Sequence, residues 1–320
     1  MTGQQEDEKF NYLFTDREAV MVDVIMPTYN HEVYIKQALE SVLNQKTQYS
    51  FRLIVGEDSS TDRTREYVMG YREKYPDKID VILSKKNWGP NITGIPMLKS
   101  CNAKYVAYLD GDDYWADDLK LEKQVSFLES RKDFIGITGN VQTIDQSGNI
   151  LQKNYELYQI RDAHVYGRKQ ASQYEMVSQI NSLINRNIYK EWNEKQWEYY
   201  AACKANGDLR ISVLLGMQGR IFFARDIMSF HRRVFQGDSW TSKTYGKDMR
   251  WTVYKMKKAI NDCSEKMLGV LCSSRAELAN NCFKDAKEVF LMTANKSNGI
   301  MVMKFLLEKW YFQMRKMRGD

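Results

Sequence analysis

Three aspartates lie within four positions at the end of one apolar run in this 320-residue chain. The stretch YVAYLDGDDYW carries Asp110, Asp112 and Asp113, and Gly111 separates the first two. An extended chain places residues i and i+2 on the same face, so Asp110 and Asp112 are expected to point the same way. Two carboxylates this close repel each other unless a cation is present, and hard divalent cations such as Mg²⁺ or Mn²⁺ suit carboxylate oxygens. A solvated turn after a strand is the alternative interpretation.

A second apolar run, FRLIVGED, also ends in acids, at Glu57 and Asp58. The SSTDRT stretch that follows can cap a helix through Thr61 or Asp62, but capping does not explain why the strand itself ends in two carboxylates. A carboxylate at this position could accept hydrogen bonds from a nucleobase N–H or from ribose hydroxyls.

Several other catalytic and ligand-binding motifs are absent. No G-x-G-x-x-G occurs, and GPNITGIP has two glycines at phosphate-loop spacing but lacks the Lys-Ser/Thr that should follow. No G-x-S-x-G nucleophile motif occurs. Three histidines, His31, His164 and His231, are too scattered for a zinc signature. Tyr114 and Trp115 exclude an EF-hand, which needs an oxygen ligand and a glycine there.

The elements that must position the acids alternate along the chain. Strand-type runs (VDVIMPT, FRLIVGE, KIDVILS, KYVAYL, DFIGIT) and helix-type patterns take turns from residue 22 to about residue 142. This alternation predicts an α/β fold with a mostly parallel, Rossmann-like sheet flanked by helices. Ligands of such sheets bind at the carboxyl ends of the strands, so all the polar strand ends should meet at one edge.

Composition and charge describe a globular protein without an obvious nucleic-acid partner. The chain is 43% hydrophobic and 28% charged, which is ordinary for a soluble domain, and its net charge of +6 is mild. Five cysteines form no C-x-x-C pair, and the polar start MTGQQEDEKF does not read as a leader. We therefore expect free thiols and a cytoplasmic location. No apolar run reaches the length of a membrane span.

Taken together, these residues resemble the family 2 glycosyltransferases, inverting enzymes with the glycosyltransferase A-type fold. VIMPTYNHEVYIKQALESVLNQ, LIVGEDSSTDRTREYV, NWGP and YVAYLDGDDYWADDLKLEKQ follow in family order over about residues 21–130. The resemblance implies metal-dependent transfer of a sugar from a nucleotide-sugar, most often a UDP-sugar, to a glycan or lipid-linked acceptor. Bacterial capsule or lipopolysaccharide synthesis is the expected setting.

The resemblance also assigns roles to individual residues. It implies a divalent metal, Mn²⁺ or Mg²⁺, at the D-x-D motif formed by Asp110 and Asp112, with Asp113 as a further candidate. Glu57 departs from the Asp of many members, and GPNITGIP replaces a frequent Arg-Asn pair, so the base and phosphate contacts can differ. The nucleotide-binding residues it implies are Pro27, Thr28, Tyr29, Asn30, Glu57, Asp58, Asn87, Asp110 and Gly111.

A second cluster, NGDLRISVLLGMQGRIFFARDIMSFHRR, resembles the acceptor half of bacterial members. On this match Asp208 is the expected general base, with Asp238 and Glu198 as competing bases and helix capping as the non-catalytic alternative for Asp208. The residues expected to contact the diphosphate or the acceptor are His231, Arg232 and Trp240.

We predict four parts along the chain. They are a polar N-terminal arm (1–20), a nucleotide-sugar-binding domain (21–142), an acceptor-binding part of the same catalytic domain (143–245) and a helical C-terminal extension (246–320). Residues 191–216 are expected to be helical, and RIFFARDIMSFHRR to be a strand.

The C-terminal extension carries an amphipathic pattern. Met303, Leu307, Trp310, Met314 and Met317 form one apolar stripe among basic residues. This pattern indicates a helix that binds the inner face of the cell membrane, with packing on the core or in a homodimer as alternatives. Two alternative functions are open. One is a nucleotidyltransferase, but the stretch PTYNHEVY lacks the Gly-rich signature of that class. The other is a non-catalytic nucleotide-sugar-binding module.

Overall fold

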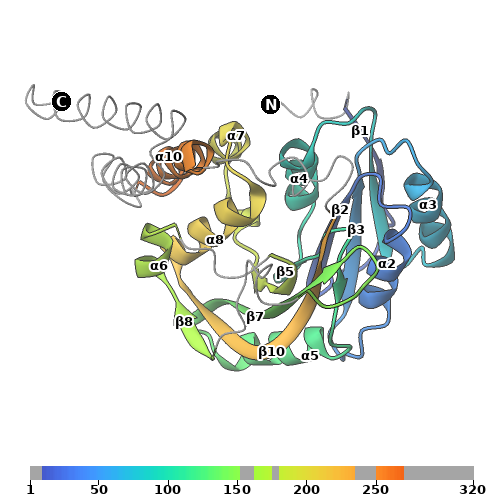
Figure 1. Ribbon diagram of the computed structural model, residues 1–320, viewed down its shortest axis with the longest axis horizontal. Helices are drawn as coiled ribbons and strands as arrows, with labels where there is room; N and C mark the ends of the chain where they lie inside the picture. The colour runs from blue at the N-terminus through green and yellow to red at the C-terminus, as the bar shows by residue number, and fades with distance from the viewer. Residues whose placement is uncertain (1–8, 152–161, 175–179, 235–249, 270–320) are drawn as a thin grey trace, which may run out of the picture.

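The computed structural model describes residues 9–151, 162–174, 180–234 and 250–269 (Figure 1). In this part of the chain one mixed sheet of ten strands runs in the order β1-β4-β3-β2-β5-β9-β7-β10-β6, and β8 pairs with β10. The strands are β1 (Phe10–Leu13), β2 (Val22–Thr28), β3 (Phe51–Glu57), β4 (Ile79–Ser84), β5 (Tyr105–Tyr108), β6 (Tyr114–Trp115), β7 (Phe134–Asp145), β8 (His164–Tyr166), β9 (Ile184–Arg186) and β10 (Arg220–Arg233).

The centre of the sheet is parallel, as predicted. Strands β4, β3, β2 and β5 pair in parallel, so their carboxyl ends lie at one edge. Beyond β5 the sheet becomes mixed, because β9 pairs antiparallel with both β5 and β7, and β10 then runs parallel to β7. β6, which follows the acidic loop, pairs antiparallel with β10. The two halves of the predicted catalytic domain therefore share one continuous sheet.

Helices cover both faces of the sheet, because alternate strand residues point to opposite sides. On one face Val24, Val55 and Ala107 pack with α2, α3 and α5. On the other face Ile25 and Ile54 pack with α4, α7, α8 and α10. The helices are α2 (Ile35–Leu43), α3 (Thr64–Lys74), α4 (Pro90–Lys99), α5 (Lys120–Ser130), α6 (Arg168–Ser172), α7 (Glu194–Ala202), α8 (Gly207–Gln218) and α10 (Arg250–Leu268), with short 3₁₀ turns η2 (Ile180–Ser182) and η3 (Tyr189–Glu191).

The structure corrects two expectations about secondary structure. The predicted polar arm contains strand β1, which adds to the sheet by pairing antiparallel with β4 and buries Phe10. The predicted helix over residues 191–216 is two helices, since the Asn193 side chain caps the start of α7 and the Asn206 side chain caps the start of α8. RIFFARDIMSFHRR forms strand β10 over its whole length, as predicted.

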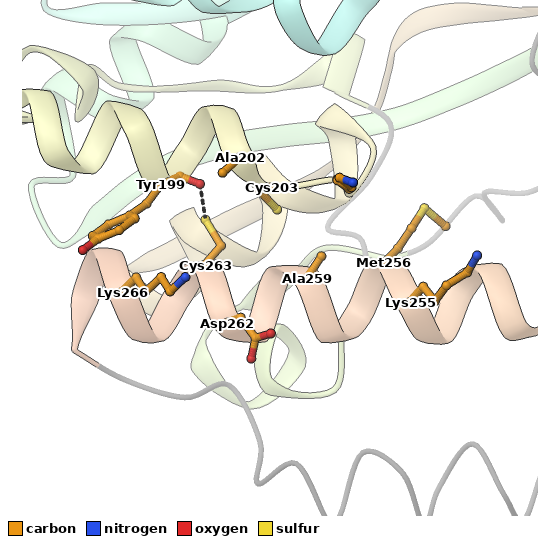
Figure 2. Close-up of a pocket in the computed structure, with 10 residues that line it drawn as sticks. Tyr199, Ala202, Cys203, Lys255, Met256, Ala259, Asp262, Cys263 and Lys266 are labelled. Carbon is orange, nitrogen blue, oxygen red and sulfur yellow. Dashed lines mark hydrogen bonds between the residues drawn. The ribbon is translucent and has the colours of Figure 1, made fainter. Parts of the chain in front are cut away.

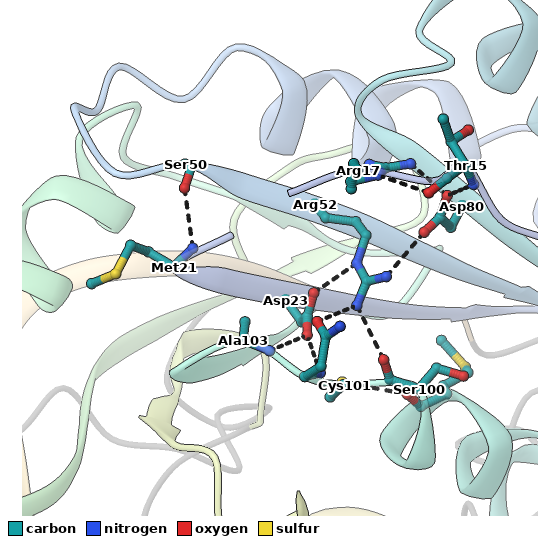
Figure 3. A network of polar contacts seen from close by, with 12 residues as sticks. Thr15, Arg17, Met21, Asp23, Ser50, Arg52, Asp80, Ser100, Cys101 and Ala103 are labelled. Atoms are coloured by element: carbon teal, nitrogen blue, oxygen red, sulfur yellow. Dashed lines mark hydrogen bonds and ion pairs between the residues drawn. The ribbon is translucent and has the colours of Figure 1, made fainter. Parts of the chain in front are cut away.

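A network of buried charged side chains joins neighbouring strands at the end of the sheet opposite the acidic strand ends (Figure 3). Arg52 of β3 donates to Asp23 of β2 at 2.8 Å and to Asp80 of β4 at 3.1 Å. Asp80 also pairs with Arg17, and Asp23 accepts the backbone N–H groups of Asn102 and Ala103. Both aspartates are fully buried, so this network holds three neighbouring strands in register by mutually paired charges.

Candidate active site

The acids that follow β5 lie on a tight turn rather than on an extended strand. The backbone N–H of Asp113 donates to the carbonyl of Asp110 at 3.0 Å, and that of Gly111 donates to Pro27 at 3.0 Å. A Cβ at Gly111 would lie 2.6 Å from the Thr28 hydroxyl oxygen, so only glycine fits beside β2. The expectation that Asp110 and Asp112 share one face of a strand is therefore wrong, because β5 ends at Tyr108.

The turn nevertheless brings Asp110 and Asp112 close enough to influence each other. Burial raises the pKa of Asp110 well above its ordinary value, and the charges of Asp208 and Asp112 raise it further. The Asp112 side chain is 27% exposed, and its carboxylate lies 3.8 Å from His31 Nε2. Bringing a divalent cation between these carboxylates would relieve their repulsion, so the pair fits a hard metal ion.

The metal ligands would not all come from side chains. Among the described residues no group of three or more His, Cys, Asp or Glu side chains is arranged to hold a metal ion. Mg²⁺ and Mn²⁺ are often bound through one or two carboxylates, with substrate phosphates and water completing the shell. Asp110 and Asp112 have the oxygen chemistry for that kind of site.

Asp113, the further candidate for the metal, is hydrogen-bonded within the protein. Its side chain is 1% exposed and accepts hydrogen bonds from the Arg232 backbone N–H at 2.6 Å, from His231 Nδ1 at 3.0 Å and from the amide of Asn181. Burial alone would lower the pKa of His231, but the charges of Asp113 and Asp112 outweigh it and raise that pKa. Asp113 therefore fixes His231 at the end of β10.

Asp208 lies close enough to these acids for its charge to act on Asp110. It occupies the first turn of α8, and the side chain that caps this helix is Asn206, which accepts the Leu209 N–H at 3.3 Å. The capping alternative for Asp208 is therefore wrong. Burial raises the pKa of Asp208 to about 6, with His231 opposing the increase and Asp113 adding to it. Glu198, the competing base on α7, is exposed.

Arg232 forms hydrogen bonds with three segments of the site. Its guanidinium donates to the carbonyls of Asp112, Asp145 and Gln146 at 3.0–3.3 Å and to the side chain of Gln37 at 2.9 Å. These bonds give Arg232 a structural role, and its contact with a diphosphate stays a prediction. Trp240 and Asp238 lie outside the described residues.

The two acids at the end of β3 accept hydrogen bonds from neighbouring protein groups. Glu57, fully buried, accepts the Ser60 N–H at 2.6 Å and Arg65 Nε at 2.5 Å. Asp58 accepts the N–H groups of Trp88 and Gly89 at 3.0 and 2.7 Å and the Thr93 hydroxyl at 2.7 Å. Their proposed contact with a nucleobase stays a prediction.

The remaining residues that are predicted to bind the nucleotide lie near the carboxyl edge of the sheet, and they differ in exposure and in hydrogen-bond partners. Asn30 has a left-handed backbone (φ 55°), and its side chain accepts the Thr61 N–H at 2.9 Å, which joins the loops after β2 and β3. Thr28 is buried at the end of β2, whereas Pro27 and Tyr29 are partly exposed beside it. The Asn87 side chain is exposed and accepts the Gly89 N–H at 3.0 Å.

Asn181, on η2, is the central site residue that the sequence analysis missed. It is fully buried, and besides donating to Asp113 its side-chain oxygen accepts the Asp110 N–H at 2.9 Å. The neighbouring Ser182 carbonyl accepts Gln124 Nε2 at 2.9 Å, which fastens η2 to α5. No local pattern marks Asn181, because its partners lie about 70 positions away in the sequence.

Among solved structures, the fold is similar to that of S. aureus TarS 1-349 in complex with UDP-GlcNAc. The TM-score is 0.60, and the alignment covers 89% of this chain and 79% of TarS 1-349 at 16% sequence identity. At this identity the likeness shows the fold, a glycosyltransferase A-type arrangement as predicted.

Among curated proteins, the chain is 37% identical over 133 residues to the putative teichuronic acid biosynthesis glycosyltransferase TuaG of Bacillus subtilis. That match spans 42% of this chain and 51% of TuaG. It is 33% identical over 132 residues to the minor teichoic acid biosynthesis protein GgaB of the same organism, over 41% of this chain and 14% of GgaB. The chain thus matches about half or less of these two relatives.

The profile of the family described as Glycosyl transferase family 2 matches residues 23–192. This segment includes strands β2 to β9 and the acidic turn after β5, and it makes up more than half of the chain. The chain therefore belongs to glycosyl transferase family 2.

Proposed function

We propose that this chain is a metal-dependent inverting glycosyltransferase that moves a sugar from a nucleotide-sugar, of the uridine class by analogy with TarS, to an acceptor hydroxyl. The acceptor would be a glycan or a lipid-linked glycan in bacterial surface-polysaccharide synthesis. The names of TuaG and GgaB support the pathway, and the UDP-GlcNAc of the TarS structure supports the donor class. Location at the inner face of the membrane stays a prediction, because residues 297–320 lie outside the described part.

The observation that carries the proposal is the juxtaposition of Asp208 and Asp110. An inverting transfer is a single displacement, which needs a base for the acceptor on one side of the sugar and a held diphosphate on the other. Asp208 comes from α8 and Asp110 from the turn after β5, yet the charge of Asp208 raises the pKa of Asp110. This supports the assignment of two different tasks to carboxylates at the carboxyl edge of the sheet.

In this mechanism Asp208 accepts the proton of the acceptor hydroxyl as its oxygen attacks C1 of the sugar. The bond between C1 and the diphosphate oxygen breaks, and the configuration at C1 inverts. Asp110 and Asp112 would hold the divalent cation, which when bound neutralises charge on the departing diphosphate. Asp113 and Asn181 keep the turn in shape, and His231 stands at the end of β10 beside Asp113.

A thermal-shift screen tests the donor half of the proposal. The purified protein is scanned with UDP, GDP, CDP and dTDP, each with and without Mn²⁺, because a ligand of the native state raises the melting temperature. A shift with one nucleotide that requires the metal is the expected result. A shift independent of metal would remove the assignment of Asp110 and Asp112 as metal ligands.

Donor hydrolysis and product stereochemistry test the transfer. Slow release of the nucleoside diphosphate from the matching nucleotide-sugar is expected, and the sugar should appear first as the anomer opposite to that of the donor in NMR spectra. Nucleotide binding without any turnover of nucleotide-sugar would instead identify a non-catalytic binding module. Retention of configuration would overturn the single-displacement mechanism.

None of the helices in the described part of the chain combines the length and apolar character that a membrane span requires. The membrane prediction therefore concerns only the amphipathic C-terminal segment. Flotation with anionic liposomes, comparing the full chain with a variant that ends before Ser297, tests it, and equal flotation of both proteins would contradict it.

A further inference from the structure

A cavity of about 430 Å³ lies between the end of α7 and α10, away from the acidic turn (Figure 2). Three exposed lysines, Lys204, Lys255 and Lys266, contribute to its wall, so the cavity reaches the solvent. Two buried cysteines, Cys203 and Cys263, contribute to the same wall. Small solutes can therefore approach a pair of thiols that the glycosyl-transfer chemistry does not use.

The two thiols come from different elements that pack against each other. Cys203 follows the last residue of α7, and Cys263 lies in the C-terminal half of α10. The Cys263 thiol is 3.7 Å from the Tyr199 carbonyl of α7, and Gln196 of α7 donates to the Met267 carbonyl of α10 at 3.2 Å. The contact between the helices thus places Cys203 and Cys263 on the wall of the same cavity, where Figure 2 shows both side chains.

The surroundings favour the thiolate form of Cys203. A hydrogen bond with the Cys263 thiol lowers the pKa of Cys203 to about 7, helped by the Ala205 backbone and Arg210, although burial opposes the decrease. A thiol in this range is roughly half ionised at neutral pH, whereas an ordinary cysteine is only a few per cent ionised. Cys101 provides a contrast, since burial raises its pKa well above the ordinary value.

We propose that Cys203 and Cys263 form a peroxide-reactive dithiol site, with Cys203 as the attacking thiol and Cys263 as the resolving thiol. The Cys203 thiolate attacks one oxygen of hydrogen peroxide, the O–O bond breaks, and hydroxide leaves to give a sulfenic acid. The Cys263 sulfur then attacks the Cys203 sulfur, and the sulfenic oxygen leaves as water with the thiol proton. The two thiols lose two electrons, and the peroxide is reduced to water.

The disulfide would join α10 to the segment that leads into α8. Arg210 of α8 already donates to the carbonyls of Tyr200 and Cys203 at 2.9 and 3.3 Å. Asp208 lies between Cys203 and Arg210 in the sequence, so the bridge would restrain the segment that presents this residue. The oxidation state of the dithiol is therefore structurally connected to the acceptor side of the site, although the thiol chemistry does not depend on glycosyl transfer.

Alkylation of the unmodified full-length protein tests the proposal first. The reduced protein is treated with a limiting amount of iodoacetamide at pH 7, and the modified sites are quantified by mass spectrometry. Cys203 should react more than about tenfold faster than Cys101, because the thiolate is the reactive species. Equal rates at the two cysteines would overturn the assignment of Cys203 as the attacking thiol.

Oxidation then tests the pairing of the two thiols. The protein and its Cys203→Ser, Cys263→Ser and Cys101→Ser variants are exposed to hydrogen peroxide, and disulfides are mapped after blocking of free thiols. A Cys203–Cys263 disulfide is expected in the unmodified protein and in Cys101→Ser, and dimedone should trap a sulfenic acid at Cys203 in Cys263→Ser. Absence of the disulfide in the peroxide-treated unmodified protein, or dimedone labelling of Cys263 in place of Cys203, would overturn the proposal.

Discussion

The amide of Asn181 donates a hydrogen bond to the carboxylate of Asp113 across 68 positions of the sequence. Through its oxygen the same side chain accepts the backbone N–H of Asp110 at 2.9 Å. Both ends of the acidic turn are therefore held by one buried residue on η2. The shape of the turn depends on this residue as well as on the backbone bonds within the turn.

Replacing Asn181 with alanine should reduce activity more than its effect on stability explains. The change leaves the buried Asp113 carboxylate without one donor, which costs about 1–3 kcal/mol of stability. It also releases Asp110, so the concentration of Mn²⁺ needed for half-maximal activity should rise. Urea unfolding and metal titration of donor hydrolysis measure the two effects.

Asn187→Ala provides the matched control. Asn187 is also buried, and its amide donates to the carbonyls of Cys101 and Ala103 at 3.0 Å, on the amino-terminal side of β5. It should lose a similar amount of stability while its metal requirement stays unchanged. If both variants shifted the metal requirement equally, Asn181 would have only a structural role.

Asp208→Asn should lower kcat by about 10²–10⁴-fold, because the amide cannot accept the acceptor proton. Nucleotide binding should persist, since the donor is held by other residues. Glu198→Gln, which removes an exposed carboxylate of α7, is the matched control and should leave kcat unchanged. Nearly full activity in Asp208→Asn would transfer the role of base to another residue.

The raised pKa of Asp208 predicts the direction in which activity and stability change with pH. Because its pKa is raised to about 6, kcat/KM should fall as the pH decreases through about 6, where the base becomes protonated. For the same reason the buried charge destabilises the native state above about pH 6, and this cost disappears below the unfolded pKa of about 3.9. Asp208→Asn should therefore melt at or above the wild-type temperature at pH 8, and a lower melting temperature would contradict this.

Gly111→Ala should weaken metal-dependent nucleotide binding and destabilise the protein. Its Cβ would lie 2.6 and 2.7 Å from the hydroxyl oxygen and the Cβ of Thr28, so either the turn or the end of β2 must move. Gly70→Ala on α3 meets no atom within 4 Å and should stabilise the protein by about 0.5–1 kcal/mol. Melting temperatures with and without UDP and Mn²⁺ distinguish the two variants, and unchanged nucleotide binding in Gly111→Ala would refute the prediction.

Arg52→Met should destabilise the protein by about 3–5 kcal/mol, because Asp23 and Asp80 stay buried with their partner removed. The network lies at the opposite edge of the sheet from the acidic turn, so kcat of the folded fraction should not change. Chemical denaturation and initial rates below the melting temperature measure both quantities. A large fall in kcat at unchanged fold would contradict the purely structural role.

The sequence predicted the parts of the fold that depend on local patterns. The alternation of strands and helices correctly placed β2 to β5 and the acids at their carboxyl ends. It did not predict β9, which has only three residues, Ile184–Arg186, and is defined by pairing with β5 and β7. Such a short strand has no periodicity of its own, so its position depends on strands distant in the sequence.

The candidate site was predictable in its residue types and less so in its contacts. The charge of Asp208 raises the pKa of Asp110, although the two residues belong to separate elements, and their roles as general base and metal ligand stay predictions. The contact of Glu57 with a nucleobase stays a prediction, and in the structure its carboxylate accepts hydrogen bonds from Ser60 and Arg65. A carboxylate at a strand end serves a ligand or a neighbouring loop equally well, and only the three-dimensional arrangement distinguishes them.

The hydrogen bond between β10 and the acidic turn has a consequence for the order in which the protein acquires its structure during synthesis. The bond from Arg232 to Asp113 spans 119 positions, so the acidic turn stays incompletely bonded until that many further residues have been translated. At about 5–20 residues per second this interval lasts roughly 6–24 seconds on the ribosome. The turn that would bind the donor is thus synthesised early and acquires its native hydrogen bonds late, once the strand that completes it has emerged.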